Sequence, residues 1–281
     1  MNWEKIIISE VRSTKGLVPR AAVWEILQAV SKGVFSDVAI ERAFRKYDLS
    51  VIDRALVTEL AFGSIRQRQL LDSWIDYLAR VPALKQPPLL RWLFHIGLYQ
   101  IFFMDRIPVS AAVNTSVELA KRQKLGRLAP VLNAVLRKAI RSHDAGETFI
   151  CKRGAVESFA CNYSIPTWLA KNLILWRGEE NANHIAKTFN SVPSIDLRVN
   201  RKRATIATVQ ENLAEVGIES NIIEGCPYGL HIVSGFGELR QWPGYNEGEW
   251  SVQDRSAQWV APLLEASPGD LILDACAAPG G

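Results

Sequence analysis

The stretch LLRWLFHIGLYQIFFM, residues 89–104, is the most apolar part of this 281-residue chain. It is shorter than the about 20 apolar residues that a membrane-spanning helix needs, and it contains Arg91, His95 and Gln100. Arg91 and His95 lie four residues apart and therefore share one face of a helix. The stretch predicts a helix that is buried on several sides in the core of a helical bundle, and it argues against a membrane span.

Helical patterns surround this stretch from Pro19 to Ser142, and no alternating strand pattern competes with them. Ser50 followed by Asp53 resembles a capping box that opens one of the helices. Gly63 falls inside the same pattern and marks either a break or a close contact between helices. Short joints containing Pro or Gly separate the segments, as in a compact bundle. The predicted helices are Ala21–Val30, Val38–Tyr47, Val51–Ala79, Leu89–Met104, Val109–Lys124 and Ala129–Arg141.

A second type of pattern follows a polar linker at residues 143–155. Two more helical segments come first, and the period then changes to that of strands. The order strand, helix, strand, strand is typical of a small α+β unit of the ferredoxin-like or RNA-recognition-motif kind, although the aromatic signature of RNA-recognition motifs is absent. The predicted elements are helices Val156–Arg177 and Glu179–Asn190, strand Ile195–Asn200, helix Ala204–Val216, and strands Ser220–Glu224 and Gly229–Ser234.

The last segment predicts the opening of a third, doubly wound domain. Trp250–Asp254 has the pattern of a strand and Ser256–Glu265 that of a helix, and Leu271–Ala275 reads as a buried parallel strand. That strand runs into Cys276-Ala-Ala-Pro-Gly-Gly281. Small residues and two glycines let the backbone approach a nucleotide-like cofactor closely.

The composition is that of an ordinary globular protein, with 48% apolar and 22% charged residues. The four cysteines form no Cys-x-x-Cys pair, and the four histidines show no spacing typical of metal ligands. We therefore expect no metal site and no disulfide framework, but reduced thiols in a cytoplasmic protein. The apolar run Ile6–Ile8 is too short for a signal peptide.

The charges are distributed unevenly along the chain. Residues 1–150 carry 22 Lys and Arg against 14 Asp and Glu, whereas residues 151–281 carry 11 against 15. A basic half favours a polyanion partner, because Lys and Arg that neutralise phosphates release counterions; a solvated helical surface is the alternative. A second candidate for contact with phosphates is the run Arg201-Lys-Arg203, against a solvated turn. The candidate RNA-binding residues of the basic half are Lys121, Arg122, Lys124, Arg127, Arg137, Lys138 and Arg141.

Several motifs resemble those of one enzyme family. Asp274-Ala-Cys-Ala-Ala-Pro-Gly-Gly281, preceded by Val252–Gln258, looks like motif I and its upstream helix in the RNA 5-methylcytosine methyltransferases of the NOL/NOP/Sun family. Leu197-Arg-Val-Asn200 resembles a strand end in that family's small α/β subdomain. Asp53–Leu60, Gly63-x-x-Arg66 and Asn133–Arg137 resemble a NusB-type helical domain.

This order is similar to that of the bacterial 16S ribosomal RNA cytosine-C5 methyltransferases of the Fmu/Sun type. The resemblance implies a multidomain chain: an all-α NusB-like RNA-binding bundle at 1–145, a helical segment with a small α+β subdomain at 156–247, and the start of a Rossmann-like methyltransferase domain at 248–281. The chain ends within motif I.

The resemblance also implies the cofactor and the partner. The family uses S-adenosylmethionine to methylate C5 of a cytosine, and small-subunit ribosomal RNA is the implied partner. NusB-like folds also carry protein partners. The residues of motif I implied to hold the cofactor are Cys276, Ala277, Ala278, Pro279, Gly280 and Gly281.

The family's catalytic machinery sets a further expectation. A cysteine attacks C6 of the flipped cytosine, an aspartate assists, and a second cysteine releases the product. These cysteines lie in Pro-Cys and Thr-Cys-Ser segments, and the 281 residues contain neither. We therefore expect no catalytic residue in this chain and an inactive fragment. The alternatives are a non-enzymatic RNA-binding or antitermination protein and a protein-interaction bundle.

Overall fold

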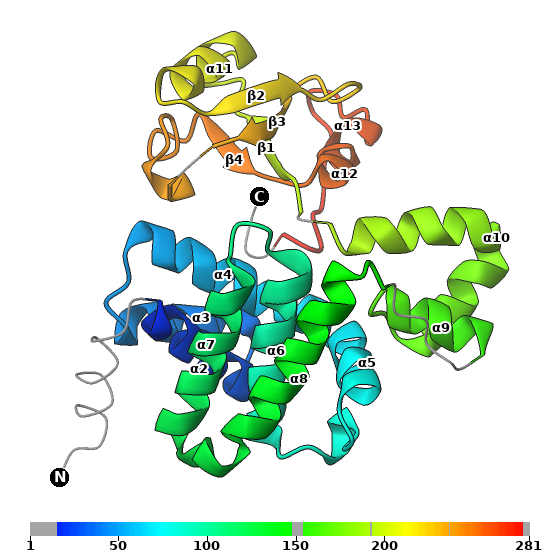
Figure 1. Ribbon diagram of the computed structural model, residues 1–281. Helices are drawn as coiled ribbons and strands as arrows, with labels where there is room; N and C mark the ends of the chain where they lie inside the picture. Colours follow the sequence, from blue (N-terminus) through cyan, green and yellow to red (C-terminus); the bar gives the residue numbers. More distant parts are fainter. Residues whose placement is uncertain (1–15, 148–153, 192, 236, 278–281) are drawn as a thin grey trace. The chain divides into compact units, whose positions relative to one another are not determined.

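The chain folds into two compact units, Met1–Ser191 and Val192–Gly281, hereafter the helical unit and the α/β unit. A computed structural model describes residues 16–147, 154–191, 193–235 and 237–277. Figure 1 shows helices throughout the first unit and a sheet with helices in the second. This division confirms a helical region followed by a small α+β region.

The helical unit is built from helices joined by short turns. Three of the turns are themselves helical, η1 (Ala83–Lys85), η2 (Lys121–Leu125) and η3 (Gly126–Leu128). The helices are α2 (Leu17–Ser31), α3 (Ser36–Lys46), α4 (Val51–Arg66), α5 (Arg68–Leu78), α6 (Pro88–Phe103), α7 (Val109–Ala120), α8 (Ala129–Asp144), α9 (Ala155–Asn162) and α10 (Thr167–Phe189).

Helix α6, which contains most of the apolar stretch at residues 89–104, lies in the middle of this unit. It packs against α2, α4, α5, α7 and α8, so most of its surface is buried. Its members Leu93, Phe94, Ile96 and Leu98 are fully buried in one continuous core. The predicted central helix is therefore confirmed. Among the described residues, no helix is both long and apolar enough to cross a membrane.

The polar residues of α6 all have partners inside the protein. The Nε of Arg20, on α2, donates a hydrogen bond to Oε1 of Gln100 at 2.8 Å, and both residues are buried. Arg91 and His95 share one face, as predicted, and both bond to Asp72 on α5. The Arg91 Nε lies 2.7 Å and the His95 Nε2 2.8 Å from Asp72 Oδ1, and Arg91 also bonds to Oδ2. Because each group is hydrogen-bonded, burial of α6 does not leave these charges isolated.

Gly63 marks a close contact between helices and not a break. A Cβ atom at this position would lie 2.0 Å from Cζ of Tyr99 on α6. The break that divides the predicted Val51–Ala79 helix lies at Gln67, which caps the end of α4 and the start of α5. A single long helix was therefore a wrong prediction at this point. At the start of α4 the capping box is confirmed, because Ser50 Oγ accepts a hydrogen bond from the Asp53 N–H.

Replacing Gly63 with alanine is expected to destabilise the helical unit by about 1 to 3 kcal/mol, because the Tyr99 ring cannot move aside in a packed core. The matched control is Gly126→Ala, since a Cβ at Gly126 meets nothing within 4 Å. Urea denaturation of both variants measures the difference. An equal loss of stability in the two variants would contradict the close packing at Gly63.

His95 is a buried histidine that stays neutral. Burial lowers its pKa, and the nearby Arg91 and Arg68 lower it further, against the raising effect of the Asp72 carboxylate. Burial raises the pKa of Asp72, but its hydrogen bonds to His95 and Arg91 outweigh this and hold the pKa below its ordinary value. The Nδ1 of His95 is buried and has no hydrogen-bond partner in the described part of the chain.

These shifts make folding sensitive to acid. Below about pH 6.5 the unfolded chain protonates His95 while the folded chain does not, so the free energy of unfolding falls as the pH falls. The contribution of Asp72 is present above the pKa of an unfolded aspartate and is lost only as the pH drops through its lower folded value. His95→Gln keeps a donor for Asp72 but does not titrate. We expect it to reduce the pH dependence of unfolding between about pH 7 and 5. A pH dependence unchanged by His95→Gln would count against this account.

Helices α9 and α10 form a small core of their own, with Phe159, Ile165 and Leu173 among its members. They belong to the helical unit, where Ser73 Oγ on α5 lies 2.8 Å from Cys161 Sγ on α9. The predicted break between two helical segments is confirmed at Gly178, where α10 leaves the helical conformation with a φ of 73°. The extent of the second domain, 156–247, remains a prediction.

The α/β unit contains one four-stranded antiparallel sheet in the order β2-β3-β1-β4. Helix α11 covers one face, where its Val209 and Leu213 pack against Leu197 and Leu230 of the sheet. The predicted strand, helix, strand, strand order is confirmed. The elements are β1 (Ile195–Val199), α11 (Ile206–Glu215), β2 (Glu219–Ile222), β3 (Gly229–Ser234), η4 (Leu239–Gln241), β4 (Trp250–Val252), α12 (Arg255–Gln258) and α13 (Val260–Leu263).

The other face of the sheet carries a buried carboxylate. Side chains alternate along a strand, so Asp196 points away from the face that Leu197 contributes to the core. Arg255 of α12 donates to both oxygens of Asp196, from Nε at 2.7 Å and from Nη2 at 2.9 Å. These hydrogen bonds, together with that of His231, lower the pKa of Asp196 even though burial opposes them. The pair fastens α12 to the sheet.

The predicted third domain differs from the structure. β4 was expected to open that domain, but it pairs with β1 as the edge strand of the four-stranded sheet. The predicted helix Ser256–Glu265 is divided into α12 and α13, and residues 271–275 form no strand. A buried parallel strand needs hydrogen-bonded neighbours, and in the part of the chain that the structure describes none lies beside Leu271 or Leu273, which are exposed. No Rossmann-like domain is therefore seen among residues 237–277.

Candidate RNA-binding surface

Helix α8 separates an apolar face from a basic one. Pro130 stands in its first turn, where a missing N–H costs nothing, as expected from the sequence. Its buried residues include Leu132, Val135 and Leu136, which recur at helical spacing. Because these residues face the core, the remaining positions face water. The exposed cations of α8 are Arg137, Lys138 and Arg141.

The turn before α8 carries the other predicted cations. Glu118 on α7 lies 3.0 Å from the Arg122 Nε and 3.8 Å from the Lys121 Nζ, so it offsets part of their charge. Lys124 adopts the left-handed conformation, with a φ of 59°, which turns the chain between η2 and η3. Lys121, Lys124 and Arg127 are exposed, and Arg122 is half-buried.

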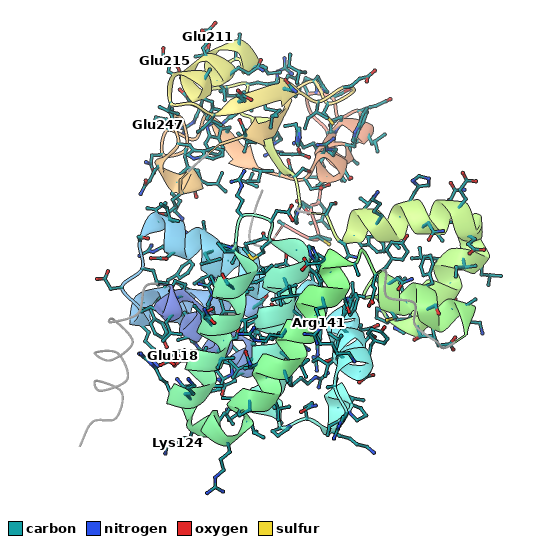
Figure 2. The ribbon with its side chains drawn as sticks, viewed as in Figure 1. Glu118, Lys124, Arg141, Glu211, Glu215 and Glu247 are labelled. Atoms are coloured by element: carbon teal, nitrogen blue, oxygen red, sulfur yellow. The ribbon has the colours of Figure 1, made fainter. Side chains whose placement is uncertain are left out.

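The structure divides the basic segment into two groups. Twelve residues of α8 separate Ala129 from Arg141, which is about 18 Å at the rise of an α-helix. Figure 2 shows Lys124 and Arg141 at separate places on the helical unit. The group near Lys124 includes cations paired with Glu118, whereas Arg137 bonds only to the neutral Asn133 among the contacts that the structure gives for its side chain. The group on α8 is therefore the stronger candidate for phosphate contact.

An aromatic ring that the sequence analysis missed lies beside this group. The Lys138 Nζ is 5.5 Å from the ring centroid of Tyr77 on α5, and it also reaches the Leu78 carbonyl at 3.4 Å. Tyr77 is 49% exposed, so the edge of its ring is open to a ligand. Tyr77 lies outside the buried apolar stripe of α5, and this position in the helical pattern is the sequence signal that could have identified it. We define the α8 surface as Tyr77, Arg137, Lys138 and Arg141.

The second predicted phosphate contact lies at the end of β1. The Arg201 guanidinium stacks 4.4 Å from the ring centroid of Tyr228, and Arg203 bonds to the carbonyl of Glu247. The side chain of Asn200 accepts from the Lys202 N–H and donates to the Gly248 carbonyl, which fixes the turn. The basic turn is therefore held in one shape, with an aromatic ring under its first arginine.

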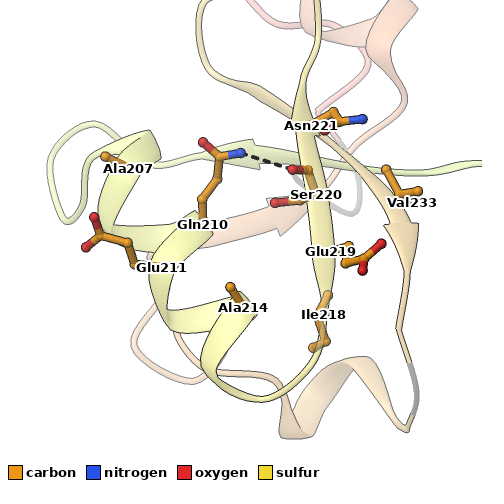
Figure 3. Close-up of a pocket in the computed structure, with 9 residues that line it drawn as sticks. All are labelled: Ala207, Gln210, Glu211, Ala214, Ile218, Glu219, Ser220, Asn221 and Val233. Carbon is orange, nitrogen blue, oxygen red and sulfur yellow. Dashed lines mark hydrogen bonds between the residues drawn. The ribbon is translucent and has the colours of Figure 1, made fainter.

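Another hollow of this unit is acidic. It lies between α11 and β2, where the Gln210 amide donates to the Ser220 carbonyl at 3.1 Å (Figure 3). Its lining includes Glu211 and Glu219 and no basic residue. Carboxylates repel phosphates, so this hollow does not suit a nucleic acid.

Comparison with known proteins identifies both units. Residues 18–141 match the NusB family, and residues 165–237 match the ferredoxin-like domain of the Methyltr_RsmF/B-like kind. A relative from Synechocystis is 40% identical over 247 residues, which is 88% of this chain and 55% of that protein. The ribosomal RNA small subunit methyltransferases B of Pseudomonas putida and Pasteurella multocida are 35% and 32% identical, over 94% and 99% of this chain.

The chain is therefore similar to ribosomal RNA small subunit methyltransferases B over most of its own length. It spans 55% to 59% of the length of these three relatives. The crystal structure of PH0851 shares its fold, with a TM-score of 0.68 at 21% identity over 95% of this chain and 60% of that one. The resemblance stated from the motifs is thereby confirmed.

The expected cofactor turn of the methyltransferase B family is described only in part. Cys276 and Ala277 lie in an exposed turn, where the Cys276 N–H donates to Oδ1 of Asp274 at 2.9 Å. The other four predicted cofactor residues, Ala278, Pro279, Gly280 and Gly281, lie outside the described residues. Two solvent-exposed residues do not by themselves fit an enclosed S-adenosylmethionine site, so no step of a mechanism follows from them.

The cysteines and acidic residues give no further site. Cys161 and Cys226 are buried free thiols, and Cys276 is exposed. In the described ranges, no cluster of three or more His, Cys, Asp or Glu side chains is placed to hold a metal. An attacking cysteine must be an accessible thiolate, and buried thiols in apolar surroundings are inert.

Proposed function

We propose that these 281 residues are the RNA-binding part of an S-adenosylmethionine-dependent 16S ribosomal RNA cytosine-C5 methyltransferase. The single observation that carries the proposal is the α8 surface within a NusB-type unit. Its three cations project from one helix, and the exposed Tyr77 ring lies beside one of them, Lys138. Arginines and lysines held on a helix neutralise phosphates with little loss of side-chain freedom, and an aromatic ring adds a stacking partner.

The proposal divides the work between regions of the full-length enzyme. The chain contains neither a Pro-Cys nor a Thr-Cys dipeptide, and these carry the two cysteines that the family uses on the cytosine ring. We therefore assign recognition of the ribosomal RNA to the residues described here and methyl transfer to residues beyond this sequence. The Cys276–Gly281 segment contributes backbone to the S-adenosylmethionine site of the full-length enzyme.

The α8 surface is tested by removing two of its charges. Arg137→Gln with Arg141→Gln is expected to weaken binding to a 16S ribosomal RNA fragment. It also lowers the slope of log affinity against log salt by about 1.5, because each phosphate contact contributes about 0.7 to 0.9. The matched control is Arg42→Gln with Arg45→Gln, two exposed arginines near one helical turn apart on α3. Equal losses in both double variants would contradict a specific surface, and absence of RNA binding by the unaltered chain would overturn the proposal.

Methyl transfer provides the second test. Incubated with 16S ribosomal RNA and radiolabelled S-adenosylmethionine, the 281-residue chain is expected to transfer no methyl group, because both catalytic cysteines are missing. The full-length Pasteurella multocida relative, assayed in parallel, is the positive control. Label at C5 of cytosine in the reaction with the 281-residue chain would show that another thiol, such as Cys276, replaces them.

A further inference from the structure

The α/β unit contains a pocket that the α8 surface does not explain. It has a volume of 460 Å³, within the range of about 300 to 1,000 Å³ that small-molecule sites span. It is lined by the β2–β3 turn and by residues of helices α12 and α13. The lining is mainly apolar, with one charged side chain, Arg198 of β1. We call it the aromatic pocket; it is lined by Arg198, Gly225, Cys226, Pro227, Tyr228, Gln258, Trp259, Ala261 and Pro262.

Two aromatic rings line the aromatic pocket, and both are held in place. A Cβ added at Gly225 would lie 3.0 Å from the Trp259 ring, so the ring packs directly on the backbone of this glycine. Gly225 also has a φ of 78°, a conformation that side chains rarely adopt. Tyr228 is held by the stacked Arg201 guanidinium, 4.4 Å from its ring centroid. Because Trp259 is 45% exposed, part of its ring is available to a ligand.

The polar groups of the pocket suit a flat, hydrogen-bonding ligand. The Gln258 side chain is buried, and its Nε2 donates to the carbonyls of Leu197 and Gln253 at 3.3 and 2.9 Å. Gln258 lines the pocket, and its amide oxygen lies beside Gly229, 2.9 Å from where a Cβ of that residue would stand, and is the acceptor of this side chain. The guanidinium of Arg198, which also lines the pocket, supplies hydrogen-bond donors. An apolar pocket with aromatic rings, one acceptor and a guanidinium matches the face and edge of a nucleobase.

A second hollow, lined by one cation, adjoins the pocket. This hollow of 410 Å³ is lined by Arg201, Thr205 and Tyr228, among others, and Pro227 and Tyr228 line both. The described α/β unit, residues 193–235 and 237–277, has six Lys and Arg against twelve Asp and Glu, and four of its six cations are Arg198, Arg201, Lys202 and Arg203. Positive charge in an otherwise acidic unit is thus concentrated beside the pocket. That concentration is complementary to the phosphates that flank a bound base.

We propose that the aromatic pocket binds one unpaired base of the RNA, stacked on Trp259 and Tyr228, while Arg201, Lys202 and Arg203 hold the adjoining phosphates. The inference rests on the proposed function, since it names a second contact of the same RNA. It makes the α/β unit a reader of single-stranded RNA. The unit therefore does more than connect the NusB-type unit to the rest of the enzyme.

The test uses the 281-residue chain and a short single-stranded RNA carrying 4-thiouridine. Trp259→Ala and Arg198→Gln are each expected to weaken binding about tenfold by fluorescence anisotropy, as loss of one stacked base does. The matched controls are Trp176→Ala, an exposed tryptophan on α10, and Arg240→Gln, an exposed arginine of the same unit. Both controls are expected to bind as the unaltered chain does. Thermal unfolding of each variant shows whether it is folded.

Photo-crosslinking of the unaltered chain keeps the test independent of variant folding. Crosslinked peptides are expected from residues 225–228 and 255–262. Crosslinks confined to the helical unit, with unchanged affinity of the Trp259 and Arg198 variants, would overturn the inference, as would a pocket filled by another polypeptide segment. That result leaves the proposed function intact if Arg137→Gln with Arg141→Gln still weakens binding. If the unaltered chain binds no RNA, both the inference and the proposed function are wrong.

Discussion

Burial of α6 on most of its surface is the constraint from which the helical unit follows. A helix surrounded by α2, α4, α5, α7 and α8 keeps most of its side chains away from water, so Arg91, His95 and Gln100 need partners within the protein. Asp72 and Arg20 supply them. Close packing also requires glycine where neighbouring helices touch α6, and Gly63 lies against Tyr99 for this reason. The rows of side chains that complete this core decide which faces of the outer helices remain for binding.

The α8 surface is a consequence of that packing. Leu136 of α8 fits against Gly97 of α6, where a Cβ would lie 2.7 Å from the leucine methyl groups. Once this face is inward, Arg137 and Arg141 are outward. In the α/β unit a polar contact orients a helix in a similar way. The bidentate pair of Asp196 with Arg255 holds α12 on the sheet. Trp259 follows α12 directly and covers Gly225, so the ion pair between the buried Asp196 and the exposed Arg255 positions a wall of the aromatic pocket.

Charge along the sequence predicts a polyanion partner, but it was a poor guide to how the basic residues are grouped in the structure. The basic segment Lys121–Arg141 looks continuous, yet a helix spreads it over about 18 Å, and Glu118 offsets part of one end. Tyr77 and Tyr228, which add aromatic surface beside cations, come from segments far away in sequence. Reading residues 121–141 alone therefore finds the charges and misses the rings. Three of the four cations at 198–203 were recognised from the sequence, and Arg198 was missed because it lies within a strand and was not grouped with the turn.

The sequence by itself determined the helices and their apolar faces, the strand, helix, strand, strand order, and the motifs that relate this chain to the methyltransferase B family. Helices form through hydrogen bonds between residues four apart, so the helices at Leu89–Met104 and Ala129–Arg141 can be predicted from their local sequence alone. A strand needs a distant partner, and only the tertiary structure decided that Trp250–Val252 pairs with β1 while residues 271–275 pair with nothing in the described chain. The same holds for the aromatic pocket, because its walls come from β1, the β2–β3 turn and α12–α13, which the sheet brings together.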